Sequence, residues 1–186
     1  MNALLGFGPV ILSACLILSA YGRAACAATG DLVVTSPAFD DGGMMPDRYA
    51  YRGENVSPPI WWSNVPQSAK TVAIICDDPD APGGSWVHWI IFNIPSASGG
   101  TPEGVPHGEA LPGGIRQGMN DFRKIGYDGP APPSGTHRYY FNVYVLDRKI
   151  DIRPGSSAKD ILAAMEGHIL AKGSLMGRYA AKDRSR

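Results

Sequence analysis

The sequence has no excess of either charge and contains few cysteines. Its 17 Lys and Arg residues are matched by 17 Asp and Glu residues, so the formal net charge is zero. Non-specific binding to nucleic acid requires a positive field, and this balance therefore argues against a nucleic-acid partner. Removal of the predicted leader would leave Cys76 as the last of 3 cysteines. Because a single cysteine cannot form an internal disulfide and this one lies in an apolar run, we expect a buried thiol.

The N-terminal segment has the pattern of a secretory signal peptide. Residues 3–20 are almost wholly apolar, and small residues precede a cleavage site predicted after Ala27. Two alternatives stay open, an uncleaved membrane anchor and lipid attachment at Cys15. Two glycines and a proline argue against the anchor, and the apolar residues beyond Cys15 argue against lipidation. We expect a signal peptide over 1–27, a single domain over 28–186, and a periplasmic or secreted protein.

Glycine and proline punctuate the rest of the chain, with 23 and 16 copies. The apolar runs between them are short, which is typical of a β-rich fold with many turns. The expected strands cover residues 31–36, 60–62, 71–77, 86–95 and 137–147. The runs at 71–77 and 86–95 are apolar on both faces, so we expect them inside the molecule. We expect the four tryptophans in the core or in a pocket wall.

One helix and one long loop complete the expected elements. Residues 157–172 have helical spacing of apolar side chains, with a capping box at Ser157 and Asp160 and a stop at Gly173. Residues 96–135 are rich in glycine and proline. A long loop of this kind inside a compact domain is usually functional.

Two histidines lie near the N-terminal ends of expected apolar strands. His88 lies in WVHWIIFNIP, and His137 opens HRYYFNVYVLD two residues before Tyr139. Because alternate residues of a strand share a face, His137 and Tyr139 project to the same side. Arg138 projects to the other side, where we expect a salt bridge. Three aspartates end the strand at 71–77 and its following turn, so pairing of these strands would bring carboxylate, imidazole and phenol groups to one rim.

Such a rim suits a small oxyanion. Protonated imidazoles and a phenol donate hydrogen bonds, and charge-assisted bonds to phosphate are strong. An isolated aspartate would repel phosphate, so we expect the aspartate to orient His88 rather than to contact the anion. Backbone N–H groups of the neighbouring loops can add donors. Affinity for an anion should then fall as the pH rises past the pKa of the histidines.

Three other chemistries match fewer features of the sequence. Two histidines and an aspartate could bind a metal, but the close HxH or HxxxH spacing is absent. The aspartates near residue 78 are interrupted by prolines and do not match an EF-hand. A serine hydrolase usually carries a G-x-S-x-G elbow, which the sequence lacks. We therefore expect no metal, no cofactor and no catalysis.

The segments DDPDAPGGSWVHWIIFNIP and YDGPAPPSGTHRYYFNVYVLD follow each other along the chain. They resemble the phosphatidylethanolamine-binding protein family, and more closely its bacterial Raf-kinase-inhibitor-like branch, and the resemblance continues in order over residues 31–180. The resemblance implies a mainly β fold, in which a large central antiparallel sheet packs on a smaller sheet. It also implies a C-terminal helix near a ligand pocket.

The resemblance further implies a pocket at one end of the sheet that accepts phosphate or the phosphoryl head group of phosphatidylethanolamine. The matching ligand-binding positions are Asp78, His88, His137 and Tyr139, with Pro79, Pro82, Trp86, Gly129 and Pro132 shaping the loops. Some relatives bind kinases or inhibit proteases, so an inhibitor or interaction protein that acts through its surface loops is the alternative function. A homodimer is also implied.

Overall fold

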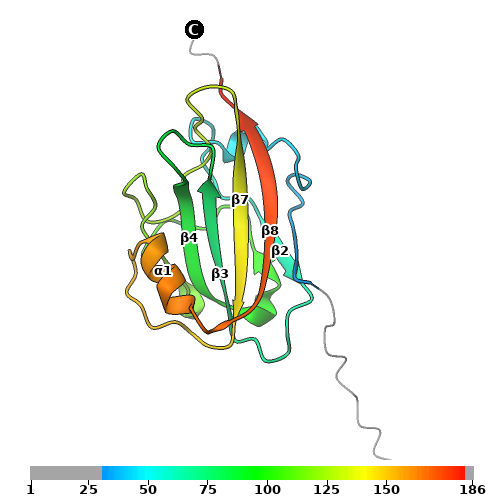
Figure 1. Ribbon diagram of the computed structural model, residues 1–186, viewed down its shortest axis with the longest axis vertical. Coiled ribbons are helices and arrows are strands. Elements are labelled where there is room, and N and C mark those ends of the chain that lie inside the picture. Colours follow the sequence, from blue (N-terminus) through cyan, green and yellow to red (C-terminus); the bar gives the residue numbers. More distant parts are fainter. Residues whose placement is uncertain (1–30, 183–186) are drawn as a thin grey trace, which may run out of the picture.

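The computed structural model describes residues 31–182 (Figure 1). The predicted signal peptide and the last four residues lie outside this part of the chain. The described strands are β1 (Val33–Thr35), β2 (Ile60–Ser63), β3 (Thr71–Asp78), β4 (Trp86–Pro95), β5 (Gly100–Thr101), β6 (Arg116–Gln117), β7 (Thr136–Leu146) and β8 (Ile169–Ala180). The described helices are α1 (Ala158–Met165) and the 3₁₀ turns η1 (Asp47–Tyr49), η2 (Ser96–Ser98) and η3 (Pro112–Gly114). The expected mainly β fold is confirmed.

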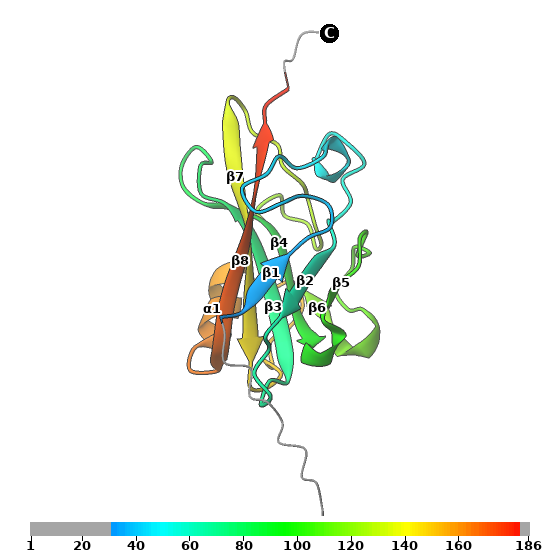
Figure 2. The same ribbon diagram turned by 90° about the vertical axis from the view of Figure 1, so that its right-hand side faces the viewer.

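The strands form two antiparallel sheets. The larger sheet has the order β6-β4-β3-β7-β8, and the smaller has the order β1-β2-β5. Figure 2 shows the small sheet on one side of the large sheet and α1 on the other. This sandwich of three layers explains the apolar runs, because both faces of β3 and β4 are covered.

Each buried face of the central strands has its own core. Val72 and Ile74 of β3 pack between the two sheets, whereas Ala73 and Ile75 face the helix. Cys76 lies in the core between the sheets and is a free, buried thiol, as the sequence predicted. Burying such apolar side chains contributes roughly 1.5–3 kcal/mol each for the larger ones, so the double-sided burial of β3 anchors the fold.

The helix is shorter than the sequence pattern indicated. Ser157 and Asp160 form the expected capping box, but α1 ends at Met165 and the chain enters β8 at Ile169. Gly167, with φ of 76°, turns the chain between the two elements. The prediction of helix through residue 172 was therefore wrong, because Gly167 rather than Gly173 ends it.

The helix also lies away from the end of the sheet at which β3 ends and β7 begins. β7 starts beside the end of β3 and runs to the opposite end of the sheet, so the helix that follows it forms there (Figure 1). The expectation of a helix near the pocket was wrong for this reason. In residues 31–182, no helix has both the length and the apolar character needed to cross a membrane.

Candidate functional site

A cavity of about 310 Å³ opens where β3 ends and β7 begins. It is lined by Asp78, Ala81, Pro82, Trp86, His88, Phe122, Ala131, Pro133 and His137. These residues come from the end of β3, the β3–β4 connection, the first residues of β4 and β7, and the long Gly/Pro-rich region. Three of the four predicted ligand-binding residues thus meet in one cavity.

His88 sits at a β-bulge. Cys76 pairs with Trp89, but the next residue of β3, Asp77, pairs with Val87, so His88 is left without a direct cross-strand partner. Bulges commonly occur beside functional sites because they re-aim a side chain. Here His88 is 3% exposed and its imidazole Nδ1 lies 2.7 Å from the carbonyl oxygen of Asp128.

The hydrogen bond of His88 determines its tautomer. A backbone carbonyl oxygen can only accept, so Nδ1 of His88 carries the proton and donates it. Burial lowers the pKa of His88 below its usual value of 6.5, although the Asp128 carbonyl and the Asp78 charge oppose the change. The ring is therefore neutral at pH 7, with Nε2 as its acceptor nitrogen.

Asp128 anchors the segment that holds His88. Its backbone N–H donates to the His88 carbonyl oxygen, which makes a two-point link between the segments. Its carboxylate is fully buried and accepts hydrogen bonds from Asn55 at 3.0 Å, Asn120 at 2.9 Å and Lys124 at 3.3 Å. Because a buried carboxylate is stable only when it is satisfied, this cluster fixes the backbone that orients His88.

His137 is held by a carboxylate instead. Its Nδ1 lies 2.7 Å from Oδ2 of Asp78, and both side chains are at least nine-tenths buried. The other oxygen of Asp78 accepts the backbone N–H of Asp80, which begins the loop toward β4. Both carboxylate oxygens of Asp78 are thus engaged within the protein, and Nε2 is the nitrogen of His137 that a ligand could contact.

The expectation that the aspartate orients His88 was wrong. Asp77 of β3 pairs with Tyr140 of β7, so Asp78 at the end of β3 lies beside the first residues of β7 and reaches His137. On the other side, the bulge takes His88 out of register with Asp78, and Asp128 holds it. The aspartate does act as an orienting group, but for the second histidine.

Tyr139 lies behind the cavity wall. Its ring packs edge-to-face against His88, with ring centroids 5.1 Å apart. Its hydroxyl is buried and has no hydrogen-bond partner among the described residues. Burial, followed by the nearby Asp78 charge, raises the pKa of Tyr139 far above its usual range, so the phenol stays protonated. The direct contact with a ligand that the sequence suggested for Tyr139 stays a prediction.

The predicted loop residues divide between different positions. Pro82 and Trp86 line the cavity, whereas Pro79 is exposed and Pro132 lines a neighbouring hollow. Gly129 is buried under the chain near Tyr49, where an added Cβ would lie 1.9 Å from the Tyr49 carbonyl oxygen. A glycine is needed there because two backbones approach each other closely.

Sequence reasoning missed Phe122 and the Asp128 cluster. Phe122 packs edge-to-face against both Trp86 and His88 and completes the apolar wall. In the sequence, Asp128 stands in a DGP stretch that is typical of an exposed turn. Only the surrounding fold shows that its carboxylate is buried and surrounded by amide donors.

Two further observations concern charged groups. Arg138 faces away from the cavity, as predicted, and forms a two-point ion pair with Asp80 at 2.6 and 2.9 Å. Between residues 31 and 182, no group of three or more His, Cys, Asp or Glu side chains is arranged to hold a metal ion.

Comparison with known proteins places the chain in a family. The family model described as phosphatidylethanolamine-binding protein matches residues 35–180. The chain belongs to the phosphatidylethanolamine-binding protein family. A UPF0098 protein of Methanothermobacter thermautotrophicus is 54% identical over 142 residues, which cover 76% of this chain and 94% of the relative.

Solved structures of the phosphatidylethanolamine-binding protein family share the fold. A homologue from Chlamydia trachomatis has a TM-score of 0.75 and 38% identity, covering 82% of this chain and 99% of that chain. Escherichia coli YbcL, described as a member of the mammalian family, has a TM-score of 0.76 and 32% identity, covering 82% of this chain and 100% of its own. Family and fold together support a binding function in general.

Proposed function

We propose that the protein binds small oxyanions, including phosphorylated head groups of the phosphatidylethanolamine type, without chemical turnover. The observation that carries this proposal is the pair of imidazoles that line one cavity with each Nδ1 already held, His88 by a carbonyl and His137 by a carboxylate. The Nε2 atoms are left for a ligand. When its ring is protonated, each Nε2 can donate to an anionic oxygen, and such a charge-assisted hydrogen bond is stronger than a neutral one.

The rest of the lining supports binding rather than catalysis. Apart from Asp78 and the two histidines, the lining side chains are those of alanine, proline, tryptophan and phenylalanine. An apolar wall around a few polar groups is typical of a binding pocket, in which the polar groups orient the ligand. The nearest thiol, Cys76, is buried, and burial raises its pKa well above the usual value, which argues against a nucleophilic role.

Isothermal titration of the protein with inorganic phosphate and with phosphoethanolamine tests the proposal. We expect saturable binding of both, and loss of binding in the double variant His88→Ala/His137→Ala. The matched control is His107→Ala/His168→Ala, which removes two histidines that do not line the cavity. If neither anion binds at millimolar concentration, or if the two double variants bind equally well, the proposal fails.

The leader suggests where the protein acts. The apolar leader supports binding in the periplasm or outside the cell, and mass spectrometry of the exported protein would show whether the chain begins after Ala27.

The alternative function is action on a kinase or protease partner through the surface loops. A stoichiometric complex with such a partner that survives His137→Ala would favour the alternative.

A further inference from the structure

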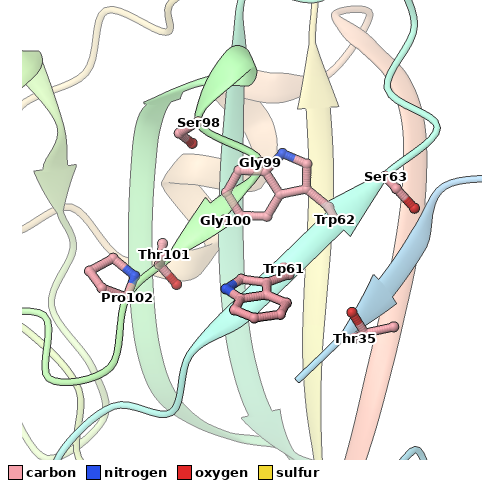
Figure 3. Close-up of a pocket in the computed structure, with 9 residues that line it drawn as sticks. All are labelled: Thr35, Trp61, Trp62, Ser63, Ser98, Gly99, Gly100, Thr101 and Pro102. Carbon is pink, nitrogen blue, oxygen red and sulfur yellow. The ribbon is translucent and has the colours of Figure 1, made fainter. Parts of the chain in front are cut away.

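A second hollow lies on the outer face of the small sheet, away from the histidines. It has a volume of about 590 Å³ and is lined by Thr35, Trp61, Trp62, Ser63, Ser98, Gly99, Gly100, Thr101 and Pro102. Figure 3 shows Trp61 at its centre, between Thr35 on one side and Thr101 with Pro102 on the other. The volume is within the range of roughly 300–1,000 Å³ that is usual for small-molecule sites.

Trp61 does not belong to the core. The neighbouring Trp62 points inward and is 5% exposed, whereas Trp61 is 52% exposed on the opposite face of β2. The sequence predicted each tryptophan in the core or in a pocket wall. Trp61 is in a pocket wall, that of this second hollow. About half of this large apolar side chain therefore stays in contact with solvent, and a ligand that covered it would gain that burial energy.

The small sheet orients the indole of Trp61. Trp61 pairs with Thr35 of β1 and with Gly100 of β5, so the three residues form a row across the sheet. A Cβ added at Gly100 would lie 2.4 Å from Cδ1 of Trp61, which shows that the indole leans over the bare glycine backbone. One side of the ring is thus supported by β5, and the rest of the ring is presented to the hollow.

The chemistry around the indole is uncharged and rich in hydroxyl groups. Thr35 and Ser63 share the outer face of the small sheet with Trp61, and Ser98 lies at the far side of the hollow. None of the nine lining residues carries a charge. Hydroxyl groups can donate and accept hydrogen bonds, so such a rim suits a neutral ligand that has many hydroxyl groups of its own.

We infer that this hollow binds a neutral saccharide, with a pyranose ring stacked on Trp61. The C–H bonds on one face of a pyranose form an apolar, slightly positive surface that complements the negative face of an indole. The hydroxyl groups at the edge of the sugar would meet Thr35, Ser63 and Ser98. This site is separate from the histidine cavity and does not depend on the anion proposal.

A second copy of the chain fits this face less well. A stable interface buries about 800 Å² on each partner and has an apolar centre. On β1, β2 and β5, the exposed large hydrophobic side chains are Val33 and Trp61. Apart from Trp62, which points inward, and Pro102, the remaining lining residues are glycines or carry hydroxyl groups, which favours a small polar ligand over a protein surface.

The test is calorimetric titration of the full protein with cellohexaose, maltohexaose and chitohexaose as probes. We expect at least one probe to bind, Trp61→Ala to weaken that binding about tenfold or more, and Trp61→Phe to restore most of it. Tyr51→Ala, which removes a half-exposed aromatic ring at a different hollow, serves as the control and should bind as the unaltered protein does. Thermal unfolding confirms that each variant is folded.

Three results would overturn the inference. The first is no binding of any probe at millimolar concentration, and the second is equal binding by Trp61→Ala. The third is concentration-dependent self-association in sedimentation that Trp61→Ala abolishes while no saccharide binds. That last result would assign the face to a second copy of the chain.

Discussion

The two histidines of the cavity occupy similar positions in the sheet but have different partners. His88 on β4 and His137 on β7 flank the end of β3, and each Nδ1 makes a hydrogen bond of 2.7 Å. The partner of His88 is a neutral carbonyl, whereas the partner of His137 is a carboxylate. The Asp128 carbonyl therefore determines the tautomer of the neutral His88 ring. The Asp78 carboxylate places a negative charge beside the His137 ring.

The largest expected effect concerns Asp128, whose buried carboxylate fixes the backbone that orients His88. Asp128→Ala removes a fully buried carboxylate, which takes away the acceptor of the Asn55 amide and one of the acceptors of the Asn120 amide. We expect a loss of about 3 kcal/mol in the free energy of unfolding, measured by urea denaturation. Glu54→Ala, which removes a carboxylate from a single exposed ion pair, is the control and should change stability little. Equal losses in the two variants would show that the Asp128 cluster is not a structural anchor.

The next effect separates the two histidines. At pH 7 the Nε2 atom of the neutral His88 ring carries no proton and can only accept a hydrogen bond from a protonated phosphate oxygen. His137 should therefore supply most of the affinity. We expect His137→Ala to weaken phosphate binding about tenfold or more, and His88→Ala to weaken it about threefold. Titration calorimetry at a single pH measures both. A larger loss of affinity in His88→Ala than in His137→Ala would mean that the carboxylate partner does not make His137 the stronger phosphate contact.

The dependence of affinity on pH sharpens the same comparison. Burial holds the pKa of His88 below 6.5 in the free protein, so the ring gains its proton only as the pH falls below that value. A bound anion favours the protonated ring, so affinity should rise as the pH is lowered and binding should take up protons. Sulfate is the suitable probe because its charge is constant over this range.

The control for the pH series is His88→Ala, which should show a flatter rise in sulfate affinity than the unaltered protein. Proton uptake is measured by repeating the titration in two buffers that differ in their enthalpy of ionisation. A flat profile between pH 5 and 8 in the unaltered protein would contradict the assignment.

The smallest effect concerns Tyr139. Its hydroxyl is buried without a hydrogen-bond partner among the described residues, so Tyr139→Phe removes an unsatisfied group and keeps the ring against His88. We expect phosphate affinity to stay within about twofold and stability to change by less than about 1 kcal/mol. A large loss of affinity would show instead that the phenol reaches the ligand, as the sequence suggested.

The strands and their meeting point could be predicted because they depend on local pattern. Apolar runs on both faces identified β3 and β4, and alternation along β7 placed His137 and Tyr139 on one side. The bulge at His88 could not be predicted, because it depends on pairing between two strands rather than on either one. Burial of Asp128 was equally hidden, since one of the amides that satisfy its carboxylate, that of Asn55, is 73 residues away in the sequence.

The central claim is that both imidazoles bind one oxyanion through their free nitrogens. The most direct test is ¹⁵N NMR of the histidine side chains during a phosphate titration, in which two of the chain's 4 histidines, His107 and His168, are internal controls. The account predicts that the Nε2 signals of His88 and His137 shift with the same midpoint while those of His107 and His168 do not move. Unchanged signals at millimolar phosphate, or shifts of equal size at all four rings, would contradict it.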